Sequence, residues 1–351
     1  PPPKTRARYG KIISSMETLT TPTSPNPPRV FKTLLAGFDA VTNHIGLLLF
    51  PIGIDLLIWL SPRLGLKKII ESWLAVYLQA RPEAPDTAEM FEAAREIWMV
   101  IAERFSLLST LRSYPVGIPS LMASGFPNQT PNGTPAWIEI SSIGTAILLY
   151  LAISVVGLVI GALYFYLVAG VGLDDKLPWR EAISGWPRAS GQVILLALMW
   201  VGLMFGISIP ALCGLLAAAL FGVAPGSTVT LIIGSIMLWM AFPLLFSAHG
   251  VFVNQRSAWS SVKKSVLITK MTLPTTMTFF MLVVLLSQGL DLLWRVPPED
   301  SWLMLIGITG HAFVATGLLA ASFIYYRESD LWVQHVQEHF KKEVDPPEQA
   351  A

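Results

Sequence analysis

The sequence predicts an all-α protein, a polytopic bundle of about six transmembrane helices with further amphipathic helices outside the membrane. Of its 351 residues, 53% are apolar and only 13% are charged, about half the charged share of a typical soluble domain. No Asp, Glu, Lys or Arg lies between Arg188 and Arg256, a stretch long enough for two helices of roughly 20 residues. The apolar runs are continuous and do not alternate with polar residues, which favours helices over the strands of a membrane barrel.

Residues 1–30 contain no apolar block and are rich in Pro, Thr, Ser, Lys and Arg. Such a segment buries too little surface to offset the entropy lost on ordering, so we predict a disordered tail. The transmembrane bundle is then expected over 31–326, followed by an amphipathic tail over 327–351 that lies against the bundle or a partner.

Six apolar segments stand out in a window of about 19 residues. The predicted spans are 40–60, 141–169, 192–222, 229–253, 274–293 and 302–326. The third segment is long and contains Pro210, and a proline inside a helix kinks or breaks it. A count of seven spans therefore remains an alternative.

Lys and Arg gather in the connections on one side of this bundle. The N-terminal tail and the connections after the second and fourth spans hold most of them, whereas 223–228 holds none and 294–301 holds only Arg295. Positively charged connections face the cytoplasm, so both termini are expected there in a multi-pass protein of the plasma membrane.

The insertion at 61–138 is expected on the opposite, external side. Apolar residues recur at helical spacing over 66–77, and a second amphipathic helix is predicted from Asp86 to Leu108. These helices either lie in the membrane interface or pack as a cap over the bundle. From Tyr114 to Trp137 the chain has five prolines and three glycines, which predicts an irregular loop.

A basic stretch at 255–270 is predicted to form a helix on the cytoplasmic face. Its four cations are Arg256, Lys263, Lys264 and Lys270, and it contains no acidic residue. We expect these side chains to contact anionic lipid head groups, and the alternative is that they only set the topology.

Two pairs of glycines at four-residue spacing lie within predicted spans, Gly157 with Gly161 and Gly202 with Gly206. Small residues at this spacing let transmembrane helices approach closely. We therefore expect close helix packing there, within the chain or in a homo-oligomer.

Ionisable residues inside spans are costly and are the default candidates for function. Asp55 lies in the stretch LLLFPIGIDLLIWLSPRLG, where Pro51 also predicts a bent helix. Asp55 and His311 are expected at a similar depth in the membrane, toward its external side, and form one candidate layer of polar side chains. His44 and His249 are expected toward the cytoplasmic side and form a second layer. These layers could form a relay that carries protons or a cation, but the favoured interpretation is that each side chain bonds a hydroxyl or backbone carbonyl of a neighbouring helix.

Asp291 is a different case, because Arg295 follows it by one helical turn. A local ion pair between these two side chains is the expected arrangement.

No motif for phosphate-loop, metalloprotease, serine-hydrolase, paired-cysteine or dinucleotide chemistry occurs in the sequence. No catalytic residue, cofactor or metal is therefore predicted, and an enzyme is unsupported. The net charge of +1 also argues against a nucleic-acid partner.

The stretch GFDAVTNHIGLLLFPIGIDLLIWLSPRLG resembles the start of uncharacterised bacterial multi-pass membrane proteins. The last third, from SAHGVFVNQRSAWSSVKKSV to AASFIYYRESD, resembles the membrane domains that accompany glycerophosphodiester phosphodiesterases. This resemblance implies a scaffold or helper role in a bacterial inner membrane, and it carries over no catalytic residue.

Together these observations predict an integral membrane protein with a structural, assembly or lipid-associated role. The expected partners are the lipid bilayer, anionic lipids at the cytoplasmic face, and a second copy or a membrane complex. One alternative is a transporter that uses the Asp/His layers, which requires a polar path between them. The other is a membrane-embedded lipid enzyme, which requires Asp55 or His311 to face an opening of lipid size.

Overall fold

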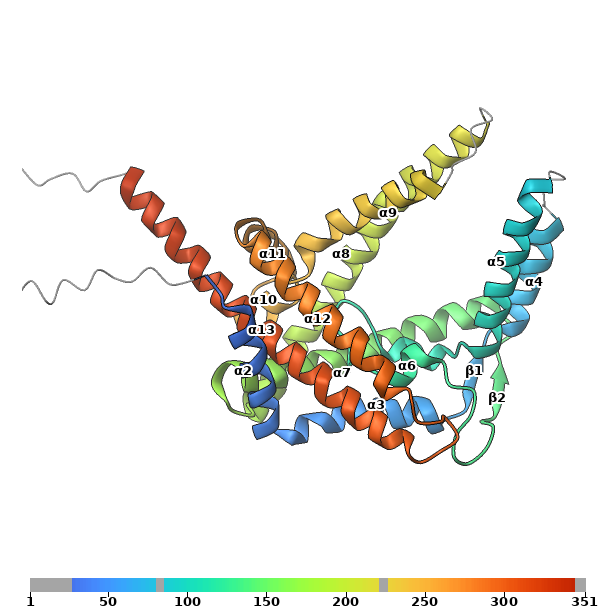
Figure 1. Cartoon of the computed structure of the whole chain (residues 1–351), viewed down its shortest axis with the longest axis horizontal. Coiled ribbons are helices and arrows are strands. Elements are labelled where there is room, and N and C mark those ends of the chain that lie inside the picture. The colour runs from blue at the N-terminus through green and yellow to red at the C-terminus, as the bar shows by residue number, and fades with distance from the viewer. Residues whose placement is uncertain (1–26, 80–84, 221–226, 345–351) are drawn as a thin grey trace, which may run out of the picture.

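The computed structural model describes residues 27–79, 85–220 and 227–344, and these residues form a bundle of helices with one small sheet (Figure 1). Five helices are long and apolar enough to cross a membrane, or six if a bent pair near the N-terminus counts as one span. The predicted fold class, a multi-pass helical membrane protein, is therefore confirmed. Of the tails predicted at 1–30 and 327–351, residues 1–26 and 345–351 lie outside the described residues. Residues 327–344 continue the last long helix, Met304–Val344.

Seven helices of the described chain carry the candidate spans. They are α2 (Val30–Asn43), α3 (Leu49–Leu60), α7 (Ile143–Asp174), α8 (Trp179–Leu220), α9 (Ser227–Ala241), α12 (Leu273–Trp294) and α13 (Met304–Val344). Short or peripheral elements complete the chain. They are η1 (Ile45–Leu48), β1 (Arg63–Gly65), α4 (Lys67–Gln79), α5 (Pro85–Arg104), η2 (Leu107–Leu111), α6 (Leu121–Gly125), β2 (Trp137–Glu139), η3 (Phe242–Leu244), α10 (His249–Val253) and α11 (Ala258–Met271). One candidate span, Leu231–Val253, begins in α9 and continues through η3 and α10.

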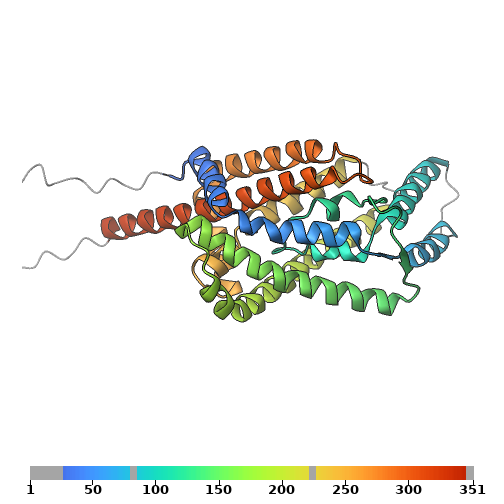
Figure 2. The same cartoon turned by 90° about the horizontal axis from the view of Figure 1, so that it is seen from below.

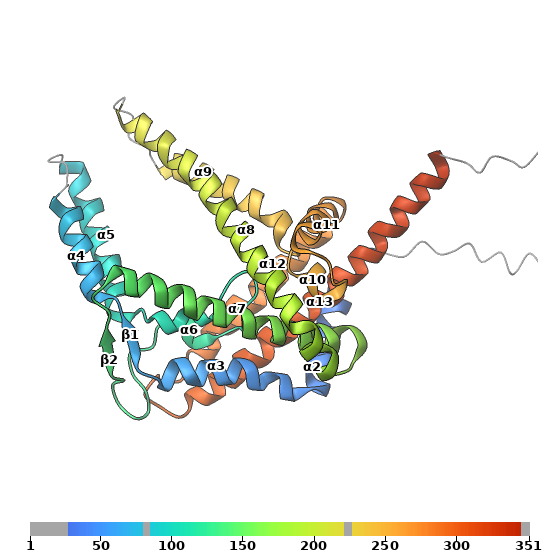
Figure 3. The same cartoon turned by 180° about the vertical axis from the view of Figure 1, so that it is seen from behind.

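The helices α3, α7, α12 and α13 run side by side along the long axis of the molecule (Figure 2). One end of this bundle carries α4, α5 and the parallel pair of β1 and β2, and we call it the hairpin end. The other end carries α2, α11 and the first and last described residues, and we call it the terminal end. The helices α8 and α9 lean away from the bundle toward the side on which α4 and α5 project (Figure 3).

The first candidate span is bent by 91° between α2 and the helical stretch Ile45–Leu60. The bend lies at His44, before Pro51, and Pro51 is the third residue of α3. A proline in the first turn lacks only a donor that has no partner within the helix, so it does not kink this helix. The helix α2 crosses α13 closely, because an added Cβ at Gly37 would lie 2.6 Å from the Cβ of Ala321.

The third span is a single helix through Pro187 and Pro210. The seven-span alternative is therefore not found in the described part of the chain. Gly202 and Gly206 have no neighbouring atom within 4 Å of an added Cβ, so the close packing predicted for this pair is absent among the described residues.

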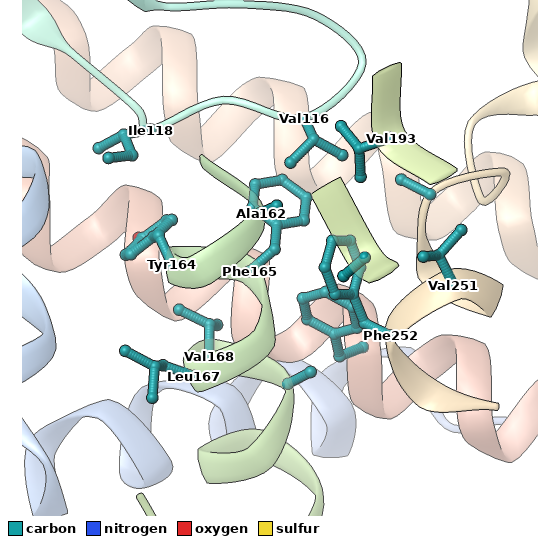
Figure 4. Packing of buried hydrophobic residues seen from close by; sticks show 14 of the residues in the cluster. Val116, Ile118, Ala162, Tyr164, Phe165, Leu167, Val168, Val193, Val251 and Phe252 are labelled. Carbon is teal, nitrogen blue, oxygen red and sulfur yellow. The ribbon is translucent and has the colours of Figure 1, made fainter. Parts of the chain in front are cut away.

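A cluster of buried apolar side chains around α7 forms most of the core. Figure 4 shows Tyr164 and Phe165 of α7 together with Val193 of α8 and Phe252 of α10. The core also includes Val116, from the segment between η2 and α6. This last contribution was not expected, since the sequence placed that segment outside the bundle.

Candidate functional site

Residues 107–126, which we call the re-entrant segment, enter the bundle from the hairpin end. The segment consists of η2, an irregular stretch and the short helix α6. It packs against α3 and α7. Its side chains Val116, Ile118 and Leu121 are at most 2% exposed. The predicted irregular loop is thus largely irregular, but its first half lies inside the bundle and not over it.

Glycines of α7 make room for this segment. An added Cβ at Gly161 would lie 3.0 Å from Cα of Gly117, and one at Gly157 would collide with the carbonyl oxygen of Leu111. Gly161 lies roughly 27 Å along α7 from Ile143, at about 1.5 Å per residue. The predicted close approach at this glycine pair therefore exists, but the partners are the end of η2 at Gly157 and irregular backbone at Gly161, and not a second transmembrane helix. Such backbone is tolerated at membrane depth only where protein buries it or where it lines a cavity.

Asp55 of α3 fixes the start of α6. Its carboxylate accepts hydrogen bonds from the Ser120 hydroxyl at 2.5 Å, the Met122 amide at 2.9 Å and the Leu121 amide at 3.2 Å. The Ser120 hydroxyl in turn accepts from the amide of Ala123 at 2.9 Å. The side chain of Asp55 is fully buried, so these donors replace the water that a carboxylate otherwise needs.

Arg63 is the other charged side chain near this end of α3, and it is also buried. Its guanidinium donates to the carbonyl oxygen of Ile58, and to that of Trp59 at an N–O distance of 3.3 Å. Burial lowers the pKa of Arg63 and the nearby Glu299 carboxylate opposes this effect. Arg63 therefore caps the C-terminal end of α3 and does not pair with Asp55.

Each of the three predicted histidines has a polar partner that is distant in the sequence. His311 lies 3.6 Å from the Asp291 carboxylate, His249 forms a 2.8 Å hydrogen bond with Ser322, and His44 lies 3.2 Å from the Asp175 carboxylate. No hydrogen bond or ion pair of the described residues joins two members of the set Asp55, His311, His44 and His249.

Arg295 does not form the expected ion pair with Asp291. Its guanidinium instead donates to the Ser124 hydroxyl at 2.8 Å. The re-entrant segment places the Ser124 hydroxyl within reach of Arg295. Asp291 instead lies beside His311. Arg295 thus anchors the outgoing end of α6 as Asp55 anchors its start.

A groove of about 940 Å³ lies between the re-entrant segment, α7 and α8. Its walls are mostly apolar, and side chains such as Leu151, Leu198 and Phe205 are more than half exposed there. Figure 3 shows how α8 leans from α7 so that the two helices diverge toward the hairpin end. Neither Asp55 nor any of the three histidines lines this groove.

Arg112 is the one charged side chain among the described residues that line the groove. It is exposed, and its guanidinium makes no hydrogen bond or ion pair within the described part of the chain. Hydroxyl groups of Ser109, Ser113 and Ser154 lie in the same lining. The arrangement suits an amphipathic molecule, with apolar walls for its chains and a cation with hydroxyls for a polar end.

At the terminal end, the predicted basic helix is present as α11, but its four cations are not equivalent. Lys264 and Arg256 lie 2.5 Å and 3.6 Å from the buried carboxylate of Asp330 on α13, so they attach α11 to the bundle. Lys263 lies over the ring of the exposed Trp259, and Lys263 and Lys270 are exposed. Only these last two remain free for the predicted contact with lipid head groups.

The described residues contain no group of three or more His, Cys, Asp or Glu side chains that could hold a metal ion. Sequence reasoning missed both the re-entrant segment and the groove. One signal was present, since Arg112 is the one charged residue between Arg104 and Glu139, which is unusual for an external loop.

Comparisons of this chain with protein-family models, with curated proteins and with solved structures find no match.

Proposed function

We propose that this integral membrane protein binds a bilayer lipid in the groove between α7 and α8. The observation that carries the proposal is the groove itself, which combines apolar walls with one polar, positively charged side. Its volume of about 940 Å³ lies near the upper end of the range of ligand pockets, about 300–1,000 Å³.

The position of the groove supports a lipid as the occupant. Both helical walls belong to candidate membrane spans, so acyl chains surround the opening in the bilayer. The side chains that line it, including Leu151, Val155, Leu198 and Val201, are apolar and exposed to that environment. A lipid enters from the side, without crossing a polar barrier.

We further infer that the terminal end faces the cytoplasm of a bacterial inner membrane. This end carries α11 and the basic connections, and cationic connections stay on the cytoplasmic side. The polar side of the groove, at the re-entrant segment, then lies toward the outer leaflet.

The proposal is tested by filling the groove. Ser154 is half-buried in its α7 wall, so we expect Ser154→Trp to displace lipid and to reduce the lipid retained per protein. The measurement is native mass spectrometry of the purified chain released from lipid nanodiscs. Val284→Trp is the matched control, because Val284 is 56% exposed on α12 and does not line the groove. Equal lipid retention by the folded Ser154→Trp variant and wild type would contradict the proposal.

The two alternatives receive less support from the same geometry. A transporter that uses the Asp/His layers needs a polar path between them, whereas each of the four side chains is held by a partner of its own. A lipid enzyme needs Asp55 or His311 at the opening, and these residues are 0% and 6% exposed and lie outside the groove lining.

A further inference from the structure

We propose that Arg112 binds the phosphate of a lipid head group, and that its uncompensated positive charge makes the groove favour lipids of net negative charge over zwitterionic lipids, which carry an ammonium group beside the phosphate. This inference rests on the lipid-binding function proposed above. It adds a chemical class of ligand and names the residue that recognises it.

The guanidinium of Arg112 lacks a partner in the described chain although it lies in a groove between candidate spans. A charged group in such a place is expensive unless an opposite charge or strong acceptors compensate it. The groove lining contains no Asp or Glu, so the compensating charge must come from outside the described residues. An anionic ligand supplies it.

The nearby carboxylates do not take this role. Asp55 and Asp291 lie within the electrostatic range of Arg112, but neither forms an ion pair with it. Asp55 is already held by Ser120 and two backbone amides, and Asp291 faces His311. Their charge therefore helps to hold Arg112 in place and leaves its donors free.

The groups around Arg112 fit a phosphate. A guanidinium presents a planar fork of donors that matches two phosphate oxygens at once. Ser109 lies one turn earlier in η2, and its hydroxyl makes no hydrogen bond within the described part of the chain. The hydroxyls of Thr110 and Ser113 already donate to the carbonyl oxygens of Leu107 and Val116 at 2.7 Å and 2.8 Å. Ser109 is thus the hydroxyl in this turn with a donor to offer.

The test compares two lipids that have the same acyl chains, phosphatidylglycerol and phosphatidylcholine. Native mass spectrometry of the full chain gives the ratio of their bound fractions at equal lipid concentration. We expect wild type to prefer phosphatidylglycerol by about tenfold, because the guanidinium repels the ammonium group that phosphatidylcholine carries beside its phosphate. Arg112→Gln is expected to bring the ratio close to one, whereas Arg112→Lys, which keeps the charge but loses the fork, is expected to keep most of the preference while retaining less of either lipid.

Lys68→Gln is the matched control. Lys68 is also exposed and lies on the hairpin end, but it does not line the groove. This variant removes the same charge and is expected to keep the preference of wild type. A preference that persists in a folded Arg112→Gln variant, or one that Lys68→Gln removes equally, overturns the inference about Arg112 while lipid binding itself stands.

Inorganic phosphate distinguishes a lipid head group from a free anion. If phosphate alone binds wild type and displaces phosphatidylglycerol, the site takes the free anion and the head-group inference fails. If Ser154→Trp leaves retention of both lipids unchanged, the proposed function fails, whatever the result for Arg112.

Discussion

At the scale of single residues, the carboxylate of Asp55 has a structural explanation. It caps α6 from a different helix, and it replaces three hydrogen bonds to water with three from the re-entrant segment. A helix start as short as that of α6 forms only where such contacts hold it, because nucleating a turn is unfavourable on its own. Asp55 therefore holds the start of α6 in place.

Asp55→Asn is expected to lower the free energy of unfolding by about 2 kcal/mol, because hydrogen bonds to a charged group contribute roughly 1.5–3 kcal/mol. Ser120→Ala removes one of the same bonds, so the double variant is expected to lose less than the sum of the two. Reversible unfolding in detergent micelles, followed by circular dichroism, measures all three variants. Unchanged stability in Asp55→Asn, combined with a loss of function, would favour the relay hypothesis.

Composition predicted which polar residues lie inside the spans, but not what they contact. His311 and Asp291 are on different helices, and the Ser120 that binds Asp55 is 65 positions away. Such partners depend on how the helices pack against each other. The periodicity of a single helix gives no information about that packing. The relay hypothesis paired Asp55 with His311, and His44 with His249, because the rise per residue places them at similar depths in the membrane. Rise per residue does not show in which direction each side chain points.

At the scale of elements, the long apolar helices were predictable because twenty continuous apolar residues have few alternatives to a span. The bend at His44 and the re-entrant segment were not predictable by the same reasoning. Prolines and glycines in 114–137 correctly indicated irregular backbone, and the surface is the usual place for such backbone. Here the glycines of α7 and the carboxylate of Asp55 provide a buried place for it.

Gly157→Ala is expected to destabilise the protein by about 1–3 kcal/mol, as overpacking of a filled site does. The added methyl group would meet the carbonyl oxygen of Leu111, which is backbone and cannot rotate away. Gly202→Ala is the matched control, since no atom lies within 4 Å of its added Cβ and alanine favours a helix. Thermal unfolding of the two variants in the same detergent gives the comparison.

Equal stability of the two glycine variants would contradict the packing of the re-entrant segment against α7. A loss of stability or of self-association in Gly202→Ala has a different meaning. It would support the prediction that Gly202 and Gly206 contact a second copy of the chain, because the described residues leave this pair without a neighbour.

At the scale of the whole molecule, different interactions stabilise the two ends of the bundle. The terminal end is held by ion pairs from Lys264 of α11 and from Arg256, just before α11, to Asp330 of α13. The hairpin end is held by the sheet, by Arg63 and by the re-entrant segment. The groove lies beside the re-entrant segment, where α7 and α8 diverge. If the groove holds a lipid as we propose, the orientation of the chain determines which leaflet supplies that lipid.

Cysteine labelling in intact cells tests this orientation. Cys213 is the only cysteine in the sequence and it is exposed, so a Cys213→Ala background is needed first. Lys68 and Lys270 are exposed near opposite ends of the bundle, and we expect a membrane-impermeant maleimide to label Lys68→Cys but to label Lys270→Cys only after the cells are broken. The reverse pattern would place the polar side of the groove in the cytoplasmic leaflet. Labelling of both sites in intact cells would contradict a bundle in which α4 and α11 lie on opposite sides of the membrane. It would also remove the transmembrane arrangement on which the proposal of a lipid in the groove depends.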